Sequence, residues 1–233
     1  MDEKSMQFAN FNITFGENDA PMLKHFSDII FPAFSGDYIR GKRDSVPRYF
    51  FAGVEIKEVD NEYVMVGNFI KETQYKVVTT VQEGVLASTP ADVPTATYSR
   101  FIVFLKNHRM VLVRNETASP DTRSFQSTVR DILNQYVRNA NRERSERDKL
   151  PIAIANIVDI PLKDSIADVL KNVNKVSWFK LRFFPLNNDL DPGPLTQHIR
   201  EDMKKVGSKT TNIVFNSPNS KDGISKMIAE SSG

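Results

Sequence analysis

Two groups of basic residues have the chemistry to bind the phosphate groups of a nucleic acid. The first group lies in and after a polar stretch that contains one glycine, and it consists of Arg40, Lys42, Arg43 and Arg48. The second group lies between two apolar runs, where a short polar connection predicts a hairpin tip, and it consists of Lys106, His108 and Arg109. Arginine can hold a phosphate with two parallel hydrogen bonds, and aromatic residues beside the first group are available for stacking. A hairpin tip is also simply where polar side chains collect, and for the second group we favour that interpretation.

Metal-dependent hydrolysis is a second possible chemistry. Its candidate residues are Asp44, Glu55 and Lys57, of which the last two are spaced to share one face of a strand. In the D…ExK arrangement of restriction-type nucleases, carboxylates hold a divalent cation and the lysine supports the attacking water. Glutamate and lysine also alternate on the exposed face of ordinary strands, and we consider that origin the more common one. Mg²⁺ is therefore a cofactor only in the nuclease alternative, and otherwise we expect no cofactor and no metal.

No other enzyme signature occurs in the 233 residues. The chain lacks cysteine, which excludes disulfides, thiolate metal sites and a cysteine nucleophile. Its three histidines, His25, His108 and His198, are not spaced for a zinc site. Neither a GxxxxGK[ST] loop nor a GxGxxG turn nor a GxSxG elbow is present. The sequence thus favours a binding protein over an enzyme.

The elements that must position these residues predict an α+β protein of two units. Residues 1–140 form the first, β-rich unit, with a strand at 8–15, an amphipathic helix after Pro21 and a long helix after Ser119. An antiparallel meander and hairpin lie between the helices, with strands at 48–57, 62–70, 75–81, 101–105 and 110–113. Residues 82–98 contain two prolines and many small polar residues, which predict a long exposed loop.

A polar connection at 141–150 separates the units. Residues 138–149 read RNANRERSERDK, with five cations against three acids, and we interpret them as a solvated segment. The second unit, residues 151–233, is predicted to be a smaller α/β unit with strands at 152–159, 177–184 and 212–215 and helices at 162–173, 194–206 and from 221 onward. Within it, Trp178 is expected to be buried with Phe179, Leu181 and Phe183.

Three stretches resemble a prokaryotic protein family of unknown function. They are Arg40-Gly41 ahead of Tyr49-Phe50-Phe51, the hairpin SRFIVFLKNHRMVLV, and SWFKLRFFPLNNDLD. The plan of a β-rich half and an α/β half also resembles the RexA-like phage-exclusion proteins, with local support from HIREDMKKVGSKTTNIVFNSP at 198–218. The resemblance spans most of residues 38–218. It implies a homodimeric protein of antiviral defence that binds double-stranded DNA without reading its sequence and acts with a partner effector protein. No catalytic residue comes with it.

A third hypothesis is a protein-interaction subunit of a defence system, in which residues 82–98 and 138–149 dock another protein. The net charge of +2 is low for a protein that binds DNA along its whole surface. No apolar run is long enough to span a bilayer, and residues 1–4 do not begin a signal peptide. We therefore expect a cytoplasmic protein without direct membrane insertion.

Overall fold

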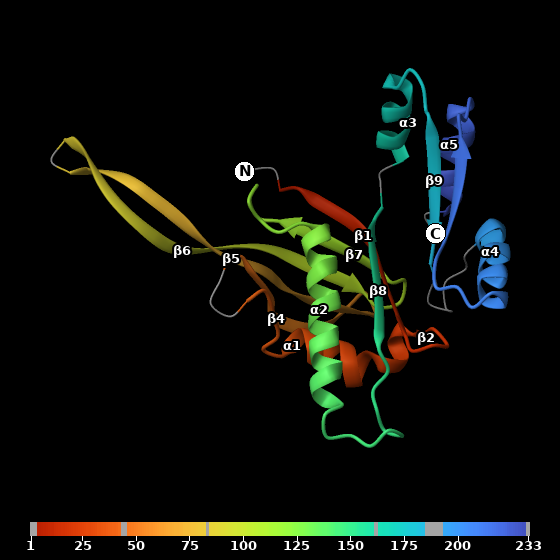
Figure 1. The fold of residues 1–233 in the computed structure, drawn as a ribbon, viewed down its shortest axis with the longest axis horizontal. Coiled ribbons are helices and arrows are strands. Elements are labelled where there is room, and N and C mark those ends of the chain that lie inside the picture. Colours follow the sequence, from red (N-terminus) through yellow and green to blue (C-terminus); the bar gives the residue numbers. More distant parts are fainter. Residues whose placement is uncertain (1–3, 43–45, 83, 161–162, 185–192, 232–233) are drawn as a thin grey trace.

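The computed structural model describes residues 4–42, 46–82, 84–160, 163–184 and 193–231, and it confirms the predicted α+β class. A large antiparallel sheet has the strand order β2-β1-β7-β6-β5-β4-β3, and β8 also pairs with β1 (Figure 1). The bounds are β1 Met6–Phe15, β2 Ala20–Pro21, β3 Ile39–Arg40, β4 Arg48–Val59, β5 Glu62–Gln82, β6 Val85–Phe104, β7 Arg109–Arg114 and β8 Ala153–Asp159.

Strand β8 belongs to this main sheet, although we assigned its residues to the second unit. It pairs with β1 from Ala9 opposite Asp159 to Phe15 opposite Ala153. Because β1 has neighbours on both sides and is covered, its alternate residues Asn12 and Thr14 are buried together with the apolar ones. Strand β1 is therefore buried on both faces over its second half, since a central strand is enclosed by elements that are distant in sequence.

Strands β5 and β6 form an arm that extends beyond the rest of the sheet (Figure 1). The last pair between β4 and β5 is Arg48 opposite Glu72, and β7 pairs with β6 no further along the arm than Ser99. From there the two strands pair only with each other, as far as Gln82 opposite Val85. The prediction of a loop at 82–98 is therefore wrong. The two prolines are compatible with a strand because the outer edge of β6 has no neighbouring strand to which they would have to donate a hydrogen bond.

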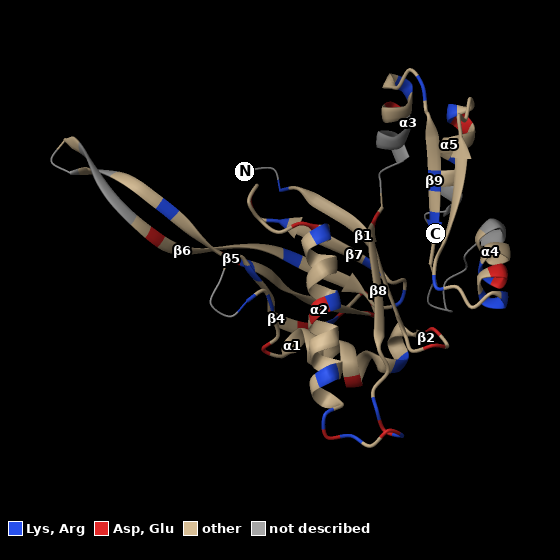
Figure 2. Cartoon of the chain, viewed as in Figure 1, with Lys and Arg blue, Asp and Glu red and all other residues tan. Residues whose placement is uncertain are grey.

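The long predicted helix is α2, Thr122–Ala140, and Asp121 is its N-cap residue. The carboxylate of Asp121 accepts a hydrogen bond from the backbone N–H of Ser124 at 2.8 Å, which satisfies one of the free donors of the first turn. Beyond the helix, the polar connection forms turns in which cations and acids are mixed (Figure 2). The side chain of Asn141 closes this connection, because it donates to the carbonyl of Leu150 at 2.9 Å and accepts from the N–H of Leu150 at 2.8 Å.

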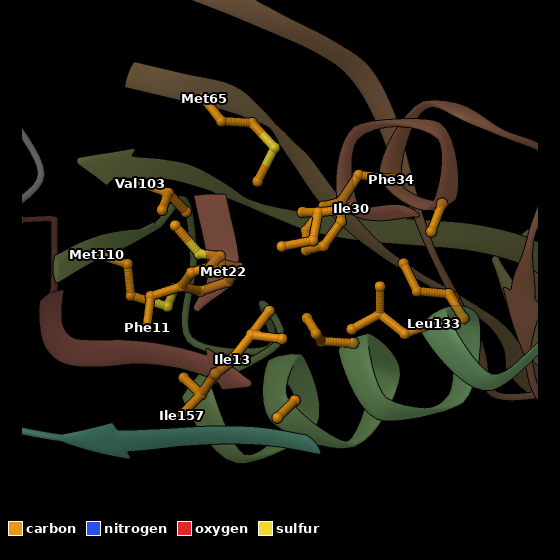
Figure 3. Close-up of a cluster of buried hydrophobic side chains, with 14 of the residues drawn as sticks. Phe11, Ile13, Met22, Ile30, Phe34, Met65, Val103, Met110, Leu133 and Ile157 are labelled. Atoms are coloured by element: carbon orange, nitrogen blue, oxygen red, sulfur yellow. The ribbon is translucent and has the colours of Figure 1, made fainter. Parts of the chain in front are cut away.

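The core between α2 and the sheet is rich in phenylalanine. Phe125 of α2 lies at its centre, with ring centroids 5.2 to 6.4 Å from those of Phe11, Phe34, Phe51, Phe69 and Phe101. Side chains from β1, β5, β6, β7, α2 and the helical segment after Pro21 converge there (Figure 3). That segment is a 3-10 turn at Met22–His25, a π turn at Phe26–Ile30 and the short helix α1 at Phe31–Ser35. Gly67 allows the approach of Phe101, because a Cβ there would lie 2.8 Å from the ring.

The second unit is built on a two-stranded antiparallel sheet of β9, Trp178–Phe183, and β10, Thr211–Asn216. Its helices are α3 Lys163–Asn172, α4 Gly193–Lys205 and α5 Lys221–Ser231. The buried side chains of Leu181, Phe183 and Met203 form a small core of their own. No described helix is both long and apolar enough to cross a membrane.

Candidate nucleic-acid interface

The first predicted basic group is only partly available to a ligand. Nε of Arg40 donates to Oγ1 of Thr128 at 2.8 Å, and its guanidinium lies 4.0 Å from the ring centroid of Tyr49. Arg48 donates from Nη2 and Nε to one carboxylate oxygen of Glu72, at 2.6 and 3.0 Å. These two arginines therefore tie β3 to α2 and β4 to β5. Lys42 is exposed.

Arg43, the remaining member of that group, lies outside the described residues.

The second predicted group lies at the turn between β6 and β7, as expected, but its side chains are engaged there. Lys106 forms an ion pair of 2.6 Å with Glu62. His108 is 1% exposed and has a left-handed backbone, and its carbonyl accepts a hydrogen bond of 2.7 Å from the N–H of Phe11. Arg109 is half-buried, and this burial lowers the pKa of its guanidinium. A role for these residues in DNA binding stays a prediction.

The residues of the nuclease alternative are incompletely placed. Glu55 and Lys57 share one exposed face of β4, as predicted, and their side chains form an ion pair of 3.4 Å with each other. Asp44 lies outside the described residues. Within the described part of the chain, no three His, Asp or Glu side chains gather in a way that could hold a metal ion.

The exposed face of α2 forms a basic stripe that is not among the two basic groups predicted from the sequence. The exposed positions of this helix are Arg123, Ser127, Arg130, Asn134, Arg138 and Asn139. The stripe contains no acid, and none of the described acids forms an ion pair with its three arginines. The arginines are spaced seven and eight residues apart, which is the repeat of one helical face, so the signal was present in the sequence.

The outer face of the β9–β10 sheet carries a second set of exposed residues. Trp178, Lys180 and Arg182 alternate on this face of β9, and Trp178 is 63% exposed. Asn212, Val214 and Asn216 stand opposite them on β10. The prediction that Trp178 is buried with its neighbours is therefore wrong. Only Phe179, Leu181 and Phe183 point to the small core, because alternate residues of a strand lie on opposite faces.

A pocket of about 510 Å³ lies where α2, β8 and the end of β9 meet. Its lining includes three cations, Arg123, Arg130 and Arg182, and one acid, Asp159. The remaining lining residues are Thr122, Gln126, Asn156, Ile157, Val158 and Phe184. Nε of Arg130 donates to the carbonyl of Ala155 at 2.8 Å, which fixes this arginine beside β8. The pocket thus combines an excess of positive charge with neutral hydrogen-bonding groups, a combination that suits an anion.

Comparisons of the chain with protein-family models, with curated proteins and with solved structures find no match.

Proposed function

We propose that the protein binds double-stranded DNA without reading its sequence, through the arginine stripe of α2 and the outer face of β9–β10. The observation that supports this most is the pocket lined by Arg123, Arg130 and Arg182 against the single acid Asp159. Arginines that replace condensed counterions on phosphates provide affinity that does not depend on base sequence. The net charge of +2 does not oppose the proposal, because cations outnumber acids in the pocket by three to one and no described acid forms an ion pair with the arginines of the stripe.

The position of Trp178 beside Lys180 and Arg182 supports contact with the nucleic acid as well. An exposed indole on a strand next to cations can stack on a base or pack against a sugar, while the cations follow the phosphates. Contacts of this kind do not read the edges of the bases, so they agree with binding to duplexes of unrelated sequence.

The proposal is tested by the salt dependence of binding to duplexes of unrelated sequence, measured by fluorescence anisotropy. We expect wild-type affinity to fall steeply with salt. In the triple variant Arg123→Ala, Arg138→Ala, Arg182→Ala, the slope of log K against log salt should fall by up to about 2.7, near 0.9 for each lost phosphate contact. Arg130 is retained because its contact with Ala155 helps to hold β8.

The matched control removes the same charge from the polar connection, in the variant Arg142→Ala, Arg144→Ala, Arg147→Ala. These cations have the acids Glu143, Glu146 and Asp148 as sequence neighbours, so their loss should change the slope little. No binding of wild type at micromolar protein in low salt would refute the proposal. An equal loss of slope in both triple variants would show a general charge effect and refute this surface as the site.

Trp178→Ala tests the stacking contact separately. Stacking of a base on an aromatic side chain contributes about 1–3 kcal/mol, so the variant should lose roughly 5- to 150-fold in affinity for a single-stranded oligonucleotide. The loss for a duplex should be smaller, because its bases are already stacked. Phe179, the neighbour on the opposite face, is no control because it packs in the core, whereas Val214→Ala changes the same exposed face. Equal affinities of wild type and Trp178→Ala for both ligands would contradict a contact with bases.

The other functions expected from the sequence stay predictions. A nuclease should degrade plasmid in Mg²⁺, and Glu55→Ala should abolish this; an intact plasmid with both proteins would remove that alternative. The role in antiviral defence, the partner effector and the cytoplasmic location come from the resemblance and the sequence pattern, and DNA binding by the surface of α2 and β9–β10 does not depend on them.

A further inference from the structure

We infer that the β5–β6 arm is a self-association element that pairs with the arm of a second copy of this chain, edge to edge along β5. The inference is independent of the proposed DNA binding. It starts from the length of the arm beyond the body. Residues 73–82 of β5 extend past the last pair with β4, which at about 3.4 Å per residue corresponds to roughly 30 Å of strand.

A two-stranded ribbon of this length is marginally stable in water, and three or more strands are usually needed. No strand of the described chain pairs with β5 beyond Glu72 or with β6 between Val85 and Tyr98, apart from their pairing with each other. The backbone groups along both outer edges of the arm are therefore exposed to another strand, a situation in which proteins either protect the edge or use it.

The two edges differ in this protection. Strand β6 contains Pro90 and Pro94, which cannot donate a backbone hydrogen bond. Its register also shifts where Val77 pairs with Ala91 and Thr79 with Ser88, so that β6 has one residue more than β5 in this interval. Prolines and bulges both discourage pairing. Strand β5 has no proline and no extra residue there, and its part of the arm is rich in β-branched residues, which favour strands. The outer edge of β5 is therefore the edge at which another strand can pair.

The charge of the arm points to a second copy as the occupant. Along the described arm beyond Thr73 and Thr95, the charged side chains are Lys76 and Asp92, which stand opposite each other on the two strands. The sequence of the arm, residues 73–95, contains one cation and two acids, so it has no excess of cations for the phosphates of a nucleic acid. Its exposed large apolar side chains, Tyr75, Val78, Val81, Val85 and Val93, are suited to pairing with the same surface.

Two-fold symmetry makes this pairing compatible with the charges. When two β5 edges pair antiparallel about an axis perpendicular to the sheet, the residue on the axis faces its own copy. The middle of the free edge is at Val77 or Val78. Lys76 then lies opposite the partner's Val78 or the partner's Thr80, so the two lysines do not face each other. The product is a sheet of four strands, β6-β5 followed by the partner's β5-β6.

Light scattering coupled to gel filtration of the full chain tests the association. We expect a particle of twice 26.5 kDa that dissociates on dilution. Val78→Lys should weaken the dimer on the order of tenfold, because the new cation faces either the partner's Lys76 or its own copy, and like charges in directly opposite positions are unfavourable. Val78 is 64% exposed, so the substitution should not unfold the chain. Ala91→Lys, an exposed position on β6 opposite Val77, is the matched control and should leave the dimer intact.

Single cysteines locate the contact, because the natural chain has none. Under mild oxidation, Val77→Cys or Val78→Cys should form a disulfide between two copies. Ala91→Cys should not, since the two β6 strands would be separated by three strand spacings, or about 14 Å, and a disulfide requires Cα atoms within about 7 Å. A chain that remains monomeric at about 100 μM would overturn the inference, because association of two copies increases with concentration. Cross-linking at Ala91→Cys that equals that at both β5 positions would overturn it as well.

Discussion

Replacing Arg40 by alanine separates a structural arginine from a ligand-binding one. The side chain donates from Nε to the hydroxyl of Thr128 at 2.8 Å and lies 4.0 Å from the centroid of the Tyr49 ring. A hydrogen bond from a charged donor contributes about 1.5 kcal/mol, and a partly exposed cation–π contact contributes about 0.5–1 kcal/mol. The hydroxyl of Thr128 still donates a hydrogen bond to the carbonyl of Ser124, so the substitution leaves no buried donor without a partner. We therefore expect Arg40→Ala to lower the free energy of unfolding by about 2 kcal/mol.

For a chain of this size, that loss corresponds to a fall in Tm of roughly 4–8 °C, which circular dichroism can follow. Arg40→Lys, which keeps the charge over Tyr49 but loses the Nε–H, should show a smaller fall. The slope of DNA affinity against salt should remain that of wild type. A melt of Arg40→Ala within 1 °C of wild type, roughly the effect of a few tenths of a kcal/mol, together with a slope reduced by about one would refute the reasoning. Arg40 would then be a phosphate contact, as the sequence alone suggested.

Three further substitutions test the core, the helix start and the hairpin packing. Phe125→Ala should lower the free energy of unfolding by about 3–5 kcal/mol, because it leaves a cavity among five rings; a denaturation midpoint near that of wild type would contradict the central place of this ring. Burial acts to raise the pKa of Asp121, but the hydrogen bonds from Ser124 outweigh it and the pKa lies below its ordinary value. Its stabilising effect should thus be complete above about pH 4 and be lost as pH falls through the lowered pKa. Asp121→Asn should therefore reduce the pH dependence of the free energy of unfolding between pH 2 and 5. An unchanged pH dependence would contradict a stabilising role of the charged carboxylate. Gly67→Ala should lower Tm, because its Cβ would lie 2.8 Å from the Phe101 ring, and a Tm equal to that of wild type would show that the ring can move.

Much of the secondary structure followed from the periodicity of the sequence. The apolar positions of α2 repeat at helical spacing, and the structure buries Phe125, Val129, Ile132 and Leu133. The alternation of β9 placed Leu181 and Phe183 on one face, and both are buried. The same alternation assigned Trp178 to the opposite face, together with Lys180 and Arg182. The adjacent Phe179 concealed this, because two neighbouring aromatic residues look like a single apolar run although they point in opposite directions.

Local sequence was a poor guide where pairing decided the structure. Residues 82–98 have the composition of a loop. Most of them nevertheless belong to strand β6, because β5 forms an antiparallel pair with β6 along its length. Strand β8 follows a polar connection that resembles a domain boundary, yet it pairs with β1, more than 130 residues earlier in the chain. Neither pairing leaves a signal within a short window, since a strand is stabilised by hydrogen bonds to a neighbour that the window does not contain.

The sequence by itself determined the α+β class, the amphipathic faces of the helices and the absence of thiol chemistry, because composition and periodicity are properties of neighbouring residues. Which cations are free was decided by the tertiary structure alone. Arg48 meets Glu72 and Lys106 meets Glu62 across strands, whereas Arg123 and Arg138 face solvent on α2 with no described acid paired to them. A charge is compensated by whatever acid lies within a few ångströms in space, and in both ion pairs that acid is distant along the chain.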